Sequence, residues 1–136
     1  MRFLKERKEF KSSLEELLKN VMDDVKEIEA AQITADTGQA LASVLPSEVD
    51  DMRFAAITAA LCSLSERAIS EMGLGTMEQA YVKGKKGYIL VLHGREDQVL
   101  TVSTTNKIQL APILFKHYKR FDDDDDKNLI SNEAPV

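Results

Sequence analysis

One long stretch of helical periodicity, residues 48–72, constrains the fold of this chain more than any other feature. Its larger apolar residues recur at steps of three and four and so predict one stripe that faces a sheet: Phe54, Ile57, Leu61, Leu64 and Ala68. Ser47 is the predicted N-cap, Asp50 and Asp51 follow at the positive end of the helix, and Gly73 is predicted to end it. A helix of this length rises about 37 Å, so the other elements have to be arranged around it.

A second stripe on the same helix consists almost entirely of small residues. Its members are Met52, Ala55, Ala56, Ala59, Ala60 and Ser63. Small side chains allow another backbone to approach closely. We therefore expect the helix to pack on its own sheet with one side, and on a second copy or a partner with the other.

The remaining periodicities predict two further helices and five strands. Helices are expected over 11–23 and near 109–121, and strands over about 26–34, 39–45, 78–82, 88–92 and 99–103. Residues 1–9 contain no helix breaker and either extend the first helix or fray. The strand at 88–92 is continuously apolar, which is typical of a strand buried on both faces. The fold class is thus α+β (an α/β sandwich) in the order α-β-β-α-β-β-β-α, with a five-stranded, mostly antiparallel sheet. We expect the long helix on one face and the terminal helices on the other.

Charge divides the chain into two parts. Residues 122–136 hold six acidic residues, including Asp122 to Asp126, and one basic residue, which accounts for the whole net charge of −5. We expect a single domain over 1–121 and an acidic, disordered tail over 122–136. The domain itself is neutral, so nucleic-acid binding is not expected.

Candidate catalytic and metal-binding residues are few. The single cysteine, Cys62, lies within the long helix, and the two histidines, His93 and His117, lie on other elements. Metal binding or Cys-His catalysis would require these side chains to lie close together. We therefore interpret Cys62 as a buried structural thiol and expect no metal, no cofactor and no set of catalytic residues. Gly73-Leu74-Gly75 follows a helix and lacks the third glycine and the lysine of a phosphate loop, so it predicts a helix C-cap.

Features of the sequence also predict the cellular compartment of the protein. One cysteine excludes a disulfide framework and fits a reducing compartment. The N-terminus is too charged for a signal peptide, and no apolar run reaches membrane-spanning length. We expect a cytoplasmic protein without membrane insertion.

Three groups of residues resemble the roadblock/dynein light chain family. They are Ala31-Gln32-Ile33 with Asp36-Thr37-Gly38 and Leu41-Ala42-Ser43; the alanine-rich helix that runs into Met72-Gly73-Leu74-Gly75; and the strand, Lys-Gly turn and Gly87-Tyr88-Ile89-Leu90-Val91 that follow. The resemblance covers about residues 10–121. Single-domain bacterial and archaeal members are the most similar, and none of the family's roles maps onto the run Asp122–Asp126.

The resemblance implies a homodimer. Members of the family usually pair through the long helix and the following strand, which in this chain implicates Met52, Ala55, Ala56, Ala59, Ala60, Ser63, Glu78, Ala80 and Val82. An uncovered edge strand also needs pairing on physical grounds.

The family's recurring role is to bind and regulate Ras-like small GTPases, or to scaffold them. The expected GTPase-binding surface consists of Glu48, Asp51, Arg53, Glu66, Arg67 and Ser70. An arginine finger from Arg53 or Arg67 is less favoured than a surface or dimer ion pair with Asp50 or Glu71.

Two alternatives stay open. One is a scaffold subunit that pairs with another roadblock-like chain in a larger complex. The other is a small-molecule sensor, against which we count strands that are continuously apolar and carry no buried polar groups. An enzyme is the least favoured class.

Overall fold

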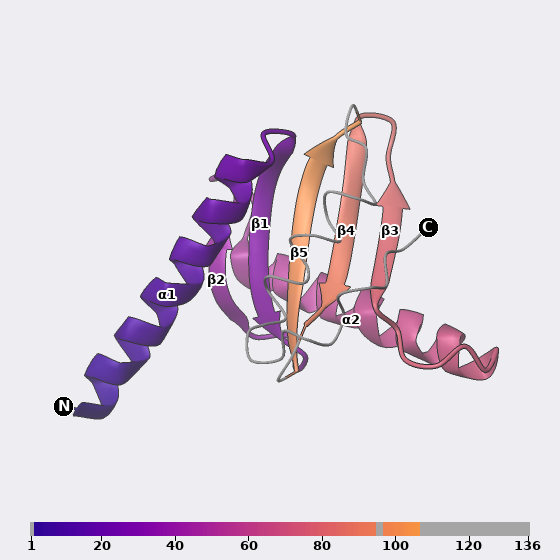
Figure 1. Ribbon diagram of the computed structural model, residues 1–136, viewed down its shortest axis with the longest axis horizontal. Helices are drawn as coiled ribbons and strands as arrows, with labels where there is room; N and C mark the ends of the chain where they lie inside the picture. Colours follow the sequence, from indigo (N-terminus) through magenta and orange to yellow (C-terminus); the bar gives the residue numbers. More distant parts are fainter. Residues whose placement is uncertain (1, 95–96, 107–136) are drawn as a thin grey trace.

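The computed structural model describes residues 2–94 and 97–106, and the predicted last helix and the acidic tail lie outside this range. The described elements follow the predicted order α-β-β-α-β-β-β (Figure 1). Their bounds are α1 Arg2–Asp24, β1 Ile28–Ala35, β2 Ala40–Val44, α2 Asp51–Glu71, β3 Gln79–Lys83, β4 Gly87–His93 and β5 Gln98–Thr105.

All five strands form one sheet in the order β2-β1-β5-β4-β3, and every neighbouring pair is antiparallel. The first and last of the described strands, β1 and β5, therefore pair in the middle, while β2 and β3 form the edges. One row of register partners crosses the whole sheet: Ser43, Gln32, Thr101, Val91 and Ala80. In the row next to it, Ile33 pairs with Leu100, and these residues face the opposite side.

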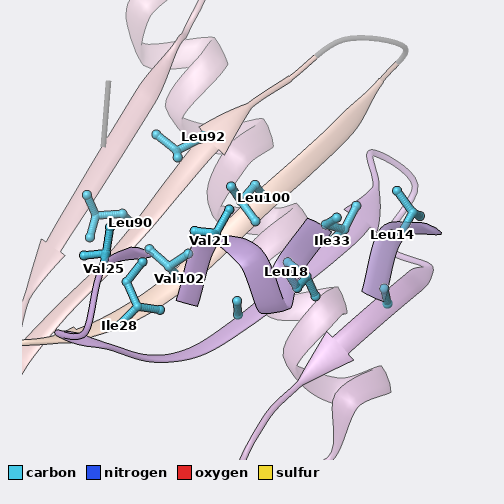
Figure 2. Packing of buried hydrophobic residues seen from close by; sticks show 12 residues of the cluster. Leu14, Leu18, Val21, Val25, Ile28, Ile33, Leu90, Leu92, Leu100 and Val102 are labelled. Carbon is cyan, nitrogen blue, oxygen red and sulfur yellow. The ribbon is translucent and has the colours of Figure 1, made fainter. Parts of the chain in front are cut away.

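The larger core lies between α1 and the sheet. Leu14, Leu18 and Val21 of α1 point toward Ile33 and Leu100 (Figure 2). Leu18 and Ile33 are fully buried. At about 25 cal/mol per Å² of apolar surface, each such side chain contributes roughly 2 kcal/mol relative to exposure. This packing holds only the second half of α1, because residues 4–13 are all exposed.

α1 begins at Arg2 rather than near residue 11. Its N-terminal half runs on beyond the sheet (Figure 1). Helical periodicity reports which residues face a core. Because the N-terminal half of α1 packs against no core, periodicity could not predict the residue at which the helix begins.

α2 covers the other face and crosses behind the sheet, with its C-terminal end beyond β3 (Figure 1). Its N-cap is Asp50, whose Oδ1 accepts hydrogen bonds from the backbone N–H groups of Met52 (2.9 Å) and Arg53 (3.2 Å). The predicted cap, Ser47, was wrong because Asp50 satisfies these donors three residues later. The helix ends in a Schellman motif, in which the Leu74 N–H donates to the Ile69 carbonyl and the N–H of Gly73, at φ +68°, donates to that of Ser70.

The stripe that α2 buries differs from the one predicted. Ala55, Thr58 and Cys62 face the sheet, whereas Ile57 and Leu64 are 57% and 63% exposed. The sheet beneath α2 is lined partly by polar and β-branched residues. Of the predicted stripe, Phe54 and Leu61 are half-buried, and Leu61 packs with Ile69 against a small core cluster of Cys62, Met77, Val91 and Val99, so only part of the predicted stripe faces the sheet.

Gly38 explains part of the small-residue stripe. It lies in the β1–β2 turn at φ +98°, and a Cβ atom there would meet the Cβ of Ala59 at 3.6 Å and the Cα of Ala56 at 3.8 Å. The close backbone neighbour of these alanines is therefore the chain's own turn. Ala55 lies in the core of the protomer and is 0% exposed.

Candidate partner-binding surface

The outward face of α2 is apolar and lacks a partner among the described residues. It presents Met52, Ala56, Ile57, Ala60, Ser63 and Leu64, all of them exposed. Residues 57, 60 and 64 follow the spacing of a seam between two packed helices. Exposed apolar residues gathered on one side of a helix indicate an interaction surface. We call these six residues the α2 outer face.

β3 continues this surface at the edge of the sheet. Only one of its edges pairs with another described strand, namely β4. Tyr81 and Val82 are 51% and 46% exposed, Ala80 is half-buried, and Glu78 just before the strand is exposed. An open edge with exposed apolar side chains favours pairing with another strand.

The predicted interface residues thus divide into two sets. Met52, Ala56, Ala60, Ser63 and Val82 are available to another molecule. Ala55 is enclosed, and Ala59 is half-buried beside Gly38. The sequence prediction placed Ile57 and Leu64 on the stripe that faces the sheet, so it did not include them in the interface. Their exposure could have been suspected because α2 carries apolar residues on two sides, and one sheet covers only one of them.

The six residues predicted to contact a GTPase are all exposed. Glu48 and Asp51 lie at the start of α2, and Glu66, Arg67 and Ser70 lie in its second half. Within the described part of the chain, neither Arg53 nor Arg67 forms the expected ion pair with Asp50 or Glu71. Glu66 instead lies 3.9 Å from His93 Nε2, at the end of β4.

Buried polar side chains line part of the sheet face beneath α2. Gln32, Thr34 and Thr101 are fully buried on this face. Gln32 Nε2 donates to Ser43 Oγ (3.0 Å) and to the backbone carbonyl of Asp51 (2.9 Å), so it ties β1 to β2 and to the first turn of α2. The expectation that the strands carry no buried polar groups was therefore wrong, and it no longer argues against a small-molecule sensor.

Three atoms of this layer have no hydrogen-bond partner in the described structure: Gln32 Oε1, Thr34 Oγ1 and Thr101 Oγ1. A buried polar group without a partner costs about 1–3 kcal/mol. These unpartnered groups therefore lower the stability of the packing between α2 and the sheet.

Cys62 lies on the sheet-facing side of α2 and is buried, as predicted. Burial raises the pKa of the Cys62 thiol above its ordinary value, and the carboxylates of Glu66 and Asp36 raise it further. A reactive thiolate is thereby disfavoured. Within residues 2–94 and 97–106 no group of three or more His, Cys, Asp or Glu side chains is arranged to hold a metal ion, and no helix there is long and apolar enough to cross a membrane.

The basic turn between β3 and β4 borders an open hollow of about 570 Å³. Lys83 Nζ lies 5.4 Å from the centre of the Tyr88 ring, and Lys85 and Lys86 complete the turn. The side chain of Asn106 donates to the Lys85 carbonyl (3.2 Å). The hollow is wide open and holds no fully buried polar side chain except at Thr104, which is typical of a solvated hairpin.

Together, these observations define a small α+β domain with helices on opposite faces of an antiparallel sheet and an exposed apolar side formed by α2 and β3. The Roadblock/LC7 domain model matches residues 14–104, and the chain belongs to that family. Its members are generally non-catalytic regulatory proteins.

Relatives and solved structures agree with this assignment. The uncharacterized proteins MJ0310 and MJ1340 of Methanocaldococcus jannaschii are each 33% identical over 86 residues, which is 63% of this chain and 75% of each relative. Myxococcus xanthus MglB has a similar structure, with a TM-score of 0.73 at 15% identity, over 82% of this chain and 86% of that one. A Roadblock/LC7 domain from Streptomyces avermitilis is similar with a TM-score of 0.58 at 24% identity, over 79% and 96%. At these identities the structural matches establish the fold alone.

Proposed function

We propose that this protein is a non-enzymatic homodimer that binds a Ras-like small GTPase and modulates its nucleotide cycle or its localisation. The observation that carries the proposal is the apolar α2 outer face beside the open edge of β3, on a chain that belongs to the Roadblock/LC7 family.

Dimerisation is the first step of this proposal. Pairing of β3 with its copy would extend the sheet and bring the α2 outer face of one protomer against that of the other. Ile57, Ala60 and Leu64 form the centre of the contact. Ala55 takes no part in it, because it is buried within the protomer.

Light scattering tests this step. The wild type is expected to have a mass near twice 15.2 kDa, and Ala60→Arg is expected to be monomeric at the same concentration. Ser12→Arg, at an exposed position on α1, is the matched control and should leave the mass unchanged. A wild-type monomer would contradict homodimerisation. It would favour the alternative that the same surface pairs with a different roadblock-like chain in a larger complex.

GTPase binding is the second step and is tested separately. The exposed charges of α2, in particular Arg53 and Arg67, are proposed to contact the GTPase beside the dimer seam. Pull-down with GTP- and GDP-loaded small GTPases from the same genome, followed by nucleotide-turnover assays, measures it. Arg67→Glu should weaken binding without changing the dimer mass, whereas Lys19→Glu on the exposed side of α1 should not. Failure to bind or alter any such GTPase would refute this step.

A further inference from the structure

The turn between β3 and β4 carries positive charge that the described residues do not balance. Lys83, Lys85 and Lys86 are all exposed and lie within four residues of one another. Among the described residues that line the adjoining hollow, Glu29 alone is acidic. In the described part of the chain, none of the three ammonium groups forms an ion pair with a carboxylate. Like charges this close repel one another, so the turn favours an anionic partner.

The acidic run Asp122–Asp126 supplies the opposite charge. Its five carboxylates are followed by Lys127, so residues 122–127 have a net charge of −4. Neither dimerisation through α2 and β3 nor GTPase binding through α2 uses this run. Three neighbouring lysines and five neighbouring aspartates are complementary in sign, and opposite charges attract at contact distance even at the protein surface.

The described chain ends beside this same turn. Asn106 directly follows β5, and its side chain donates a hydrogen bond to the Lys85 carbonyl (3.2 Å). Residues 107–121 connect Asn106 to Asp122. If 109–121 is the helix that the sequence predicts, this helix spans about 20 Å, and five aspartates in extended form can return over about 17 Å. The acidic run is therefore long enough to reach the turn.

The other basic segment of the chain is less suitable as a binding site for the acidic run. Residues 2–11 of α1 include Glu6 and Glu9, which interrupt the positive charge. α1 is 23 residues long and rises about 34 Å, and its N-terminal end lies far from the β3–β4 turn (Figure 1). The turn is thus both the nearer and the more uniformly basic of the two.

We propose that the acidic run Asp122–Asp126 docks on Lys83, Lys85 and Lys86 of the same chain. A segment tethered to its own site binds at an effective concentration on the order of millimolar, so ion pairs that would be too weak between separate molecules are populated. Lys83 is the last residue of β3. The docked run consequently lies at one end of the open β3 edge and makes that end less accessible to another strand. The proposal is independent of GTPase binding.

Paramagnetic broadening in NMR spectra of the full chain tests the proposal. A nitroxide is attached to the variant Asn128→Cys, and the wild type treated in the same way is the blank, because its Cys62 is buried. Broadening should be strongest at the backbone amides of residues 83–87. It should disappear in about 1 M salt, where the Debye length falls from about 8 Å to about 3 Å. Each exposed ion pair shifts such an equilibrium about two-fold, so Lys83→Gln/Lys85→Gln/Lys86→Gln should lower the ratio of docked to free tail about ten-fold.

A matched control removes the same charge elsewhere. Lys5→Gln/Lys8→Gln/Lys11→Gln takes three positive charges from exposed positions of α1 and should leave the broadening of residues 83–87 unchanged. Absent or uniform broadening, or stronger broadening on α1 than at the turn, would overturn the proposal, as would equal losses in the two triple variants.

A mixed sample separates docking within one chain from docking between chains. Isotope-labelled chains without nitroxide are mixed with an excess of nitroxide-labelled chains, and residues 83–87 of the former should then show little broadening. Broadening that persists undiminished in this mixture would overturn docking within one chain and would indicate the tail of a second copy as the occupant.

Discussion

Replacement of Gln32 by methionine should leave stability almost unchanged, although Gln32 is a fully buried residue that makes two hydrogen bonds. Its Nε2 donates to Ser43 Oγ and to the Asp51 carbonyl, while its Oε1 has no partner in the described structure. Methionine has nearly the same length and shape and carries neither the donor nor the acceptor.

The expected magnitude follows from these two opposing terms. Loss of two hydrogen bonds costs about 2 kcal/mol in net terms, and removal of one unpartnered buried carbonyl returns about 1–3 kcal/mol. The Asp51 carbonyl keeps a possible helical donor in the N–H of Ala55, and Ser43 is only half-buried, so neither is left isolated. The net change for Gln32→Met is therefore within about 1 kcal/mol. Gln32→Ala loses the same groups and also leaves a cavity, so it should be less stable than Gln32→Met by at least about 2 kcal/mol.

Urea unfolding followed by far-UV circular dichroism measures both variants. Protein concentration has to be held constant, because dimerisation would couple it to stability, and equal m-values are required for the comparison. A loss above about 2 kcal/mol in Gln32→Met would refute the reasoning. It would mean that the two hydrogen bonds outweigh the unpartnered carbonyl.

Three further predictions concern single positions. Asp50→Ala should cost about 1 kcal/mol of unfolding free energy through loss of the helix cap, whereas Ser47→Ala should change it by less than about 0.5 kcal/mol; the reverse order in urea unfolding would contradict the observed cap. Gly87→Ala should cost about 3 kcal/mol or more, because a Cβ atom there would overlap the Thr104 carbonyl oxygen; Gly84→Ala, whose Cβ would lie 3.6 Å from the Gly87 oxygen, is the control and should be tolerated. Because the folded-state pKa of Cys62 is raised, its contribution to stability is fully present below about pH 9 and is lost as the pH rises toward the folded-state pKa. Stability should therefore fall less steeply above that pH in Cys62→Ala than in the wild type, and parallel pH profiles of the two proteins would show that the thiol does not contribute.

The order of the elements could be predicted from the sequence because local signals mark it. Turn residues such as Gly38, the change from helical to alternating periodicity after Gly75, and the continuously apolar run of β4 are readable without tertiary information. The described strands differ from the prediction by at most two residues at each end. The last predicted helix lies outside the described residues and stays a prediction.

The rotation of α2 about its axis could not be predicted in the same way. Both of its apolar stripes satisfy helical periodicity, and the choice between them depends on what the sheet offers. That face holds Gln32, which the alternation along β1 suggests is exposed but which is fully buried. Burial of a polar residue depends on partners such as Ser43 and Asp51, 11 and 19 residues away in sequence, so no local pattern reveals it.

The position of β5 between β1 and β4 has a consequence for synthesis of the protein. β1 is among the first elements to leave the ribosome, but its central partner follows 63 residues later, since Ala35 pairs with Gln98. At about 5–20 residues per second, the inner edge of β1 waits roughly 3–13 s before it can pair. During that time the nascent chain can hold two separate hairpins, β1–β2 and β3–β4, and the last strand joins them into one sheet. A chain that stops before Gln98 would keep two inner edges open to other nascent chains, so completion of β5 is the step that protects this domain from aggregation.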